Sequence, residues 1–111
     1  MSQNHPVLTL TLQATAAVNA QTFVDYTGAT SAAGGNAAGV ARTNANPGDL
    51  FPADTLGTTV VIAGAAITAG QRLQSDANGN AIPKAAGVAV AVALEAASAQ
   101  GQTIEVSLIP N

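Results

Sequence analysis

The segment from residue 67 to residue 109 alternates short apolar runs with tight turns, and this pattern restricts the possible fold more than any other feature of the chain. Within it, Asn78 and Gly79 lie between two extended stretches. Asn-Gly in that setting is the strongest short-range signal of a β-hairpin, because both positions tolerate positive φ. With these two residues as the turn, we expect Ser75 to face Ile82 across the hairpin.

Two further runs in this segment have the period-two pattern of strands. Residues 103 to 109 alternate, which places Ile104 and Val106 on the inner face of a strand and Glu105 on the outer face. In residues 86 to 94, valine or leucine recurs at every second position with small residues between. This composition predicts a central strand that is covered on both faces.

The rest of the chain reads in the same way, as short β-strands between turns. Asn46 to Asp49 fits a type II turn, and residues 27 to 38 have the Gly- and Ala-rich composition of a mobile loop. We predict an all-β fold, a small β-sandwich or barrel of about six to eight short strands. The expected strands are residues 7–13, 22–26, 39–42, 58–63, 71–75, 81–84, 86–94 and 103–109.

A chain of 111 residues fits a single domain. We expect residues 1–13 to form an N-terminal arm with the first strand, and residues 14–111 to form one β-rich domain. In the first strand, Leu8, Leu10 and Leu12 lie on one side and Val7, Thr9 and Thr11 on the other. The strand is therefore expected to be half buried.

Charged side chains make up only 8% of the chain, against about 25% in an ordinary soluble domain. Its surface must therefore consist largely of small and neutral residues, which a partner can bury at low cost. Arg42, Arg72 and Lys84 are the only basic side chains, too few to bind nucleic acid. The chain contains no cysteine, and no apolar run approaches the length of a membrane span. Because residues 1–12 have no basic flank and no continuous apolar core, we expect no secretory signal.

Reactive constellations are missing from the sequence. His5, the only histidine, lies in the polar lead-in before Pro6, and no third partner is near to orient it. The carboxylates form no evident catalytic pair, and we expect each to bond amides of a nearby turn. Those considered are Asp49, Asp54, Asp76, Glu95 and Glu105. The sequence predicts no enzyme.

Residues 76 to 80, Asp-Ala-Asn-Gly-Asn, resemble the start of a calcium loop. The pattern then fails, since glycine stands at its fourth position rather than the sixth, and Gly87 occupies the twelfth, where a bidentate glutamate belongs. Glycine-rich phosphate loops are also absent. We therefore expect no metal and no cofactor.

Two segments are candidates for contact with a partner. The first strand has strong pairing potential, so Val7, Leu8, Thr9, Leu10 and Thr11 could add to the sheet of a neighbour, although the strand could equally pair within its own sheet. A second candidate contact, Leu50 with Phe51, places two large apolar side chains in a turn-rich region. These two residues could instead close one end of the core.

The sequence resembles the capsid cement, or head-decoration, proteins of tailed bacteriophages, over about residues 39 to 109. The likeness is carried by Gly39-Val40-Ala41, Thr55-Leu56-Gly57, Val60-Val61-Ile62, Ile67-Thr68-Ala69-Gly70-Gln71, Ser75-Asp76-Ala77-Asn78-Gly79, Ala93-Leu94-Glu95-Ala96-Ala97-Ser98 and Gly101-Gln102-Thr103-Ile104-Glu105-Val106. The resemblance implies a compact β-rich domain on the outside of the phage head, often a trimer, that ties neighbouring capsomers together. It brings no catalytic residues.

We therefore expect a structural virion protein, made in the host cytoplasm, that binds the major capsid protein on the outer capsid surface and stabilises the shell. A small ligand- or glycan-binding β module is the alternative. Glycan sites usually need aromatic platforms, and Phe23, Tyr26 and Phe51 are the whole aromatic supply.

Overall fold

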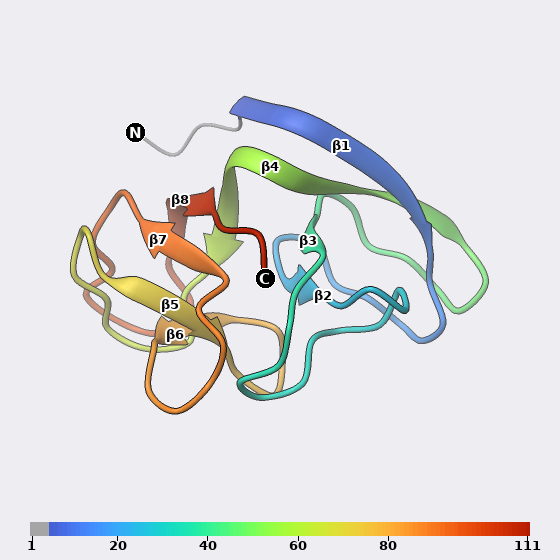
Figure 1. Ribbon diagram of the computed structural model, residues 1–111. Helices are drawn as coiled ribbons and strands as arrows, with labels where there is room; N and C mark the ends of the chain where they lie inside the picture. The colour runs from blue at the N-terminus through green and yellow to red at the C-terminus, as the bar shows by residue number, and fades with distance from the viewer. Residues whose placement is uncertain (1–4) are drawn as a thin grey trace.

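The computed structural model describes residues 5 to 111, which form eight β-strands and no helix (Figure 1). Accordingly, no helix in this part of the chain is long and apolar enough to cross a membrane. The predicted all-β fold is confirmed. The strands are β1 (His5–Gln13), β2 (Phe23–Val24), β3 (Gly39–Ala41), β4 (Leu50–Ile62), β5 (Arg72–Ser75), β6 (Ala81–Pro83), β7 (Ala91–Ala93) and β8 (Thr103–Leu108).

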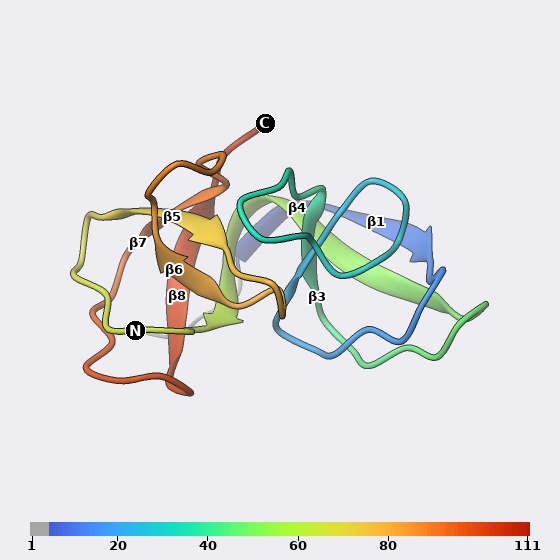
Figure 2. The same ribbon diagram turned by 90° about the horizontal axis from the view of Figure 1, so that it is seen from below.

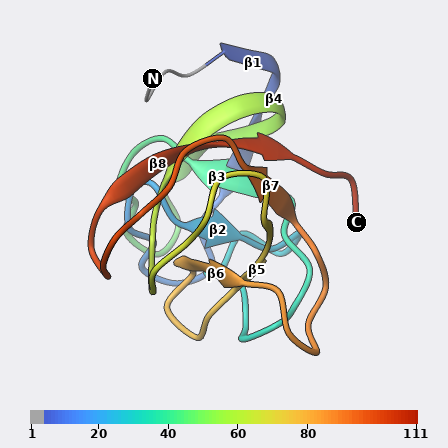
Figure 3. The ribbon, with the colours of Figure 1, turned by 90° about the vertical axis from the view of Figure 1, so that its left-hand side faces the viewer.

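One antiparallel sheet curls into a small barrel. Its neighbours follow the order β2-β3-β4-β8-β7-β5-β6, and β1 adds to β4 outside this path. The two ends of the sheet meet where the amide of Phe23 in β2 donates to the carbonyl of Gly79, 2.7 Å away, in the turn between β5 and β6. Figure 3 shows the strands arranged around a common centre. Closure in this way covers the edges that β2 and β6 would otherwise expose.

The longest strand, β4, pairs with three others: β1, β3 and β8. Its residues 53 and 54 lie between β1 and β3, and Thr58–Ile62, a β-branched run, pairs with β8. We expected only residues 58–63 as strand, and Pro52 and Gly57 are local signals for a break before them. Pro52 is tolerated because β3 ends at Ala41, so no ladder donor is needed opposite it. Gly57, with φ of 95°, lets the strand change direction without ending.

Two apolar clusters lie on opposite faces of β2, β3 and the first half of β4. Phe23 and Val40 point into the barrel core, whereas their neighbours Val24 and Ala41 point into the second core. These short strands are apolar at successive positions because both faces are covered. The largest buried side chains of the barrel core are Phe23, Leu73, Ile104, Val40, Val61, Val90 and Val106, and those of the second core are Phe51, Val18 and Val24.

The predicted hairpin is confirmed, but its register differs by one residue. Ser75 pairs with Ala81 rather than Ile82, because the turn is longer than the two residues Asn78 and Gly79. The carboxylate of Asp76 accepts hydrogen bonds from the amides of Asn78 and Asn80, and among these residues only Gly79 has positive φ. The predicted turn at residues 46–49 also forms, with Gly48 at φ of 89°.

The predicted central strand at residues 86–94 is much shorter than expected. Only Ala91–Ala93 form β7, between β5 and β8, and it is the alanines at positions 91 and 93 that face the barrel core while Val92 is half buried. The preceding residues leave the ladder because the amides of Ala85 and Gly87 both donate to Oε1 of Gln74. Periodicity predicted a longer strand, since it does not take account of this side-chain acceptor.

The Gly- and Ala-rich segment at residues 27–38 is a loop, as predicted, but it packs closely against the barrel. Ser31 and Ala37 are buried, and the amide of Gly34 donates to the carbonyl of Ser75 over 2.8 Å. Glu105, expected to face outward, is also buried, and its amide donates to the Glu95 carboxylate. Neither the packing of this loop nor the burial of Glu105 in β8 can be predicted from composition.

A glycine pair tests whether the β5–β6 turn closes the barrel. Gly79 and Gly101 both have positive φ, so alanine at either position introduces backbone strain of about 1 to 2 kcal/mol. A Cβ at Gly79 would also lie 2.8 Å from Thr30 and 2.9 Å from the carbonyl of Phe23, whereas one at Gly101 would meet nothing within 4 Å. Urea unfolding should show Gly79→Ala less stable than Gly101→Ala by about a further 1 to 3 kcal/mol. Equal losses would mean that this turn does not contribute to closure.

Candidate functional site

β1 lies on the outside of the molecule. Among the described residues it pairs only with β4, and the two strands form a long twisted ribbon that extends from the barrel (Figures 1 and 2). The ladder runs from His5 opposite Thr58 to Gln13 opposite Leu50. One edge of β1 is therefore paired with β4, and the other edge lies at the surface.

The ribbon carries most of the exposed apolar surface. Five of the eight large apolar side chains that are exposed among the described residues belong to it. Val7 and Leu50 are 79% and 70% exposed, and the other three are between 37% and 45% exposed. We call these five residues the ribbon surface: Val7, Leu8, Leu10, Leu50 and Leu56.

The predicted contact residues fall into two groups. Val7, Leu8, Leu10 and Leu50 lie in the ribbon surface, and Thr9 and Thr11 are exposed on the same strand. Phe51 is only 1% exposed and packs in the second core. We therefore remove Phe51 from the candidate surface, because residues 50 and 51 point to opposite faces of β4 and only one of them can reach a partner.

A half-open apolar groove of about 250 Å³ lies beside the ribbon. Leu8, Leu10 and Leu12 of β1 form one wall. Tyr26 and Ile109 belong to the facing segments, the loop after β2 and the C-terminal tail. The periodicity of β1 correctly places the three leucines on one side, but Leu8 and Leu10 face this groove rather than a closed core.

The C-terminal residue holds the far wall of the groove in place. The side-chain amide of Asn111 pairs with the main chain of Ala37, accepting from its amide at 2.9 Å and donating to its carbonyl at 3.0 Å. The hydroxyl of Tyr26 donates to the main-chain carbonyl of Asn111 at 3.0 Å. The groove is thus built by segments from both ends of the chain and from its middle.

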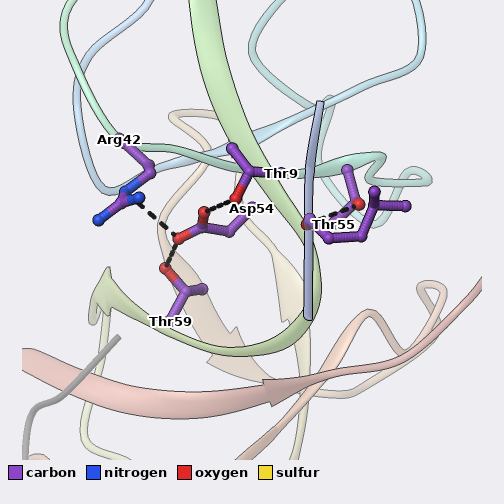
Figure 4. A network of polar contacts seen from close by, with 6 residues as sticks. Thr9, Arg42, Asp54, Thr55 and Thr59 are labelled. Carbon is purple, nitrogen blue, oxygen red and sulfur yellow. Dashed lines mark hydrogen bonds and ion pairs between the residues drawn. The ribbon is translucent and has the colours of Figure 1, made fainter. Parts of the chain in front are cut away.

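A buried carboxylate holds β1 onto β4. Asp54 of β4 is fully buried and accepts hydrogen bonds from the hydroxyls of Thr9 in β1, at 2.9 Å, and Thr59, at 2.8 Å (Figure 4). Nε of Arg42 lies 3.7 Å from its second oxygen. A buried charge needs such partners, since an unpaired one would be costly. Asp54 therefore fixes the position of β1 at the centre of the ribbon.

A β-bulge lies beside this contact. The β1–β4 register shifts on both sides of Leu8, and the hydroxyl of Thr55 donates to the carbonyl of Leu8 at 3.0 Å (Figure 4). A bulge leaves one residue unpaired and bends the strand locally. Val7, the most exposed apolar residue of the ribbon surface, lies at this bend.

The carboxylates do not assemble a reactive centre. Asp49 and Asp76 bond local amides, as predicted. Asp54 and Glu105 differ from the expectation, because both are buried within strands rather than placed at turns. Among the side chains that the structure describes, no three histidine or acidic groups cluster as metal ligands would. The side chain of His5 lies outside the described residues.

The aromatic residues offer little to a sugar ligand. Phe23 and Phe51 are buried in the two cores, and Tyr26 alone is exposed. A glycan platform would need rings open to stacking. The geometry therefore favours an apolar contact surface over the alternative of a glycan-binding site.

The comparisons with known proteins agree with this arrangement. The family model described as phage cement protein matches residues 1–108. The chain belongs to the phage cement protein family. The resemblance stated from the sequence is thereby confirmed, and this member of the family is a structural protein of a phage head. No curated protein matches the chain.

A solved structure shares the fold. It is the crystal structure of the head fiber gp8.5 N base in bacteriophage phi29, with a TM-score of 0.77 and 24% sequence identity. The alignment covers 92% of this cement protein and 93% of the phi29 chain. The fold thus recurs in a chain of different sequence.

Sequence reasoning missed three parts of the site. Leu56 stands in the quoted motif Thr55-Leu56-Gly57, and an apolar residue beside a glycine bend was a usable signal for exposure. An aspartate inside the apolar run of residues 51–56 was a signal for a buried network. No local signal marked Asn111, whose partner Ala37 is 74 residues away.

Removing the Asp54 carboxylate should destabilise the protein strongly. Asp54→Ala leaves the buried hydroxyl of Thr59 without its acceptor and detaches Thr9, so we expect a loss of about 2 to 4 kcal/mol in urea unfolding. Asp49→Ala is the matched control, because its exposed carboxylate accepts only one local amide bond, from Asn46; about 1 kcal/mol or less should be lost. Similar losses in the two variants would contradict the anchoring role of Asp54.

The turn that carries Tyr26 should respond to acid. Burial, which by itself raises the pKa of Asp25, is outweighed by hydrogen bonds from the hydroxyl of Thr27 and the amides of Ala29, Thr27 and Gly28, so its pKa lies below the usual 3.8. A lowered folded-state pKa contributes stability that is present above the unfolded value and is lost as pH falls through the folded value. The wild type should therefore exceed Asp25→Asn in urea midpoint at pH 7, and the difference should shrink below a pH of about 4. A difference that does not change with pH would contradict this assignment.

Proposed function

We propose that this cement protein binds the outer surface of a phage capsid and stabilises the shell by bridging major capsid subunits. The ribbon surface is the observation that carries the proposal. An exposed apolar patch that the fold leaves uncovered commonly marks an interaction site. Here all five residues belong to a ribbon that extends from an otherwise closed barrel, and three of them, Leu8, Leu10 and Leu56, lie together along the apolar groove.

The charge distribution supports contact with protein rather than nucleic acid. The net charge is −3, and β1 has no acidic or basic side chain from Val7 to Gln13. An acidic chain is suited to the side of the shell away from the packaged DNA. A neutral strand can be desolvated without burying an unpaired ion.

The contact of one copy need not be strong. Many copies on one head, and several chains within one oligomer, would convert a modest contact into high avidity. We propose a trimer over a threefold or quasi-threefold position, assembled after synthesis in the host cytoplasm. In this arrangement each ribbon reaches a different capsid subunit, which is what bridging requires.

Two leucine variants test the proposal. Leu8 of the ribbon surface and Leu94 after β7 are 42% and 38% exposed, so aspartate at either position perturbs the fold to a similar extent. Leu8→Asp should weaken binding to expanded heads that lack the cement protein by at least about tenfold, because it introduces a charge into an apolar contact. Leu94→Asp should bind as the wild type does.

Co-sedimentation of the purified protein with such heads measures both affinities, and the number of copies bound at saturation tests the threefold arrangement. Thermal unfolding of each variant controls for loss of fold. The proposal would be contradicted by failure of the wild type to bind, or by equal effects of the two substitutions.

A further inference from the structure

The main-chain groups of Thr9 and Thr11 point away from β4. The carbonyl of Pro52 accepts from the amide of Arg42 on the β3 side, so residue 52 turns its main-chain groups toward β3 and not toward β1. Thr11 is opposite Pro52, and its own N–H and C=O therefore face outward, as in any pair of an antiparallel ladder that is not hydrogen bonded. Thr9, two residues away and opposite Asp54, has the same orientation.

The central part of this outer edge of β1 has none of the side chains that usually block an edge strand. Edge strands are commonly blocked by lysine, by proline or by inward-pointing charge. Between Val7 and Gln13 the strand contains none of these. Within the described residues, β1 pairs with no strand other than β4. Two donors and two acceptors thus remain available, spaced about 7 Å apart along the strand.

The open edge has defined ends. At one end, the bulge at residues 6–9 interrupts the regular spacing of β1. At the other end, the carbonyl of Gln13 lies against Gly28, where a Cβ would collide with it. The amide of Thr15 also donates to the carbonyl of Gly28 over 3.3 Å. The loop that contains Gly28 therefore covers this end of the β1 edge. The edge can therefore accept only a short strand.

We propose that an extended, uncharged segment of the major capsid subunit adds to β1 as a further strand and hydrogen-bonds the main chain of Thr9 and Thr11. This inference rests on the proposed function and specifies how the ribbon binds. Its affinity would come from the main-chain bonds, and its specificity from apolar side chains placed beside Leu8 and Leu10. Such a strand needs no charge, in keeping with the neutral character of β1.

A second copy of the chain meets an obstruction when its β1 pairs about a twofold axis at Leu10. This antiparallel register would bring Val7 of each copy opposite Gln13 of the other. Gly28 covers the Gln13 carbonyl at that point. A segment that ends near Thr11 avoids the obstruction, which favours a short capsid segment as the occupant.

Hydrogen–deuterium exchange at single-residue resolution tests the inference on the intact protein. In the free protein, the amides of Thr9 and Thr11 should exchange fast and those of Leu10 and Leu12, which face β4, slowly. On heads, exchange at Thr9 and Thr11 should slow by about 100-fold or more, as expected for new main-chain hydrogen bonds.

A proline variant gives an independent readout. Thr11→Pro removes an outward N–H that takes no part in the β1–β4 ladder, and proline is tolerated at such edge positions. It should weaken binding to heads by about tenfold, because one main-chain hydrogen bond to the added strand is lost. Urea unfolding of the variant and the wild type separates this effect from loss of stability.

The outcomes distinguish the inference from the proposed function. If the protein co-sediments with heads while Thr9 and Thr11 exchange as fast as in the free protein, strand addition is wrong and capsid binding stands. If the wild type does not bind heads, both are wrong. Protection of Thr9 and Thr11 in concentrated protein without heads would identify a second copy as the occupant and overturn the assignment to the capsid.

Discussion

The double pairing of β4 is the constraint on which the rest of the structure depends. At residues 53 and 54 this strand has β1 on one edge and β3 on the other, and further along it pairs with β8. Asp54 lies at this junction and binds side chains from β1 and from the second half of β4. The barrel and the ribbon are therefore one body, and the orientation of β1 follows from the same strand that closes the core.

The scarcity of charge is consistent with this architecture. Only 8% of the residues of the chain are charged, so its surface consists largely of small neutral side chains and main-chain groups. The buried polar side chains of the described residues all have partners within the fold, so the barrel itself has no unsatisfied group to offer. What remains uncovered is the apolar ribbon surface and the outer edge of β1, which are features of a binding surface rather than of a catalytic centre.

The hairpin at Asn78-Gly79 and the inward face of β8 were predictable, because turn chemistry and period two are local properties. The full length of β4 was not, since Pro52 and Gly57 are local signals for a break that neighbouring strands overrule. For the same reason, only one residue of the predicted contact pair Leu50 and Phe51 is exposed, namely Leu50. Which of two adjacent residues is buried depends on the face that the sheet turns toward a core.

The sequence by itself determined the all-β class, the hairpin, the neutral surface and the likeness to cement proteins, because these depend on residue types and on spacings of a few positions. Only the tertiary structure decided which edge of β1 remains open, which carboxylate is buried and what forms the groove. The responsible contacts join residues far apart in the chain, such as Thr9 with Asp54 and Tyr26 with Asn111, separated by 45 and 85 positions. Local sequence patterns do not predict such pairings, because these contacts form only when the sheet closes.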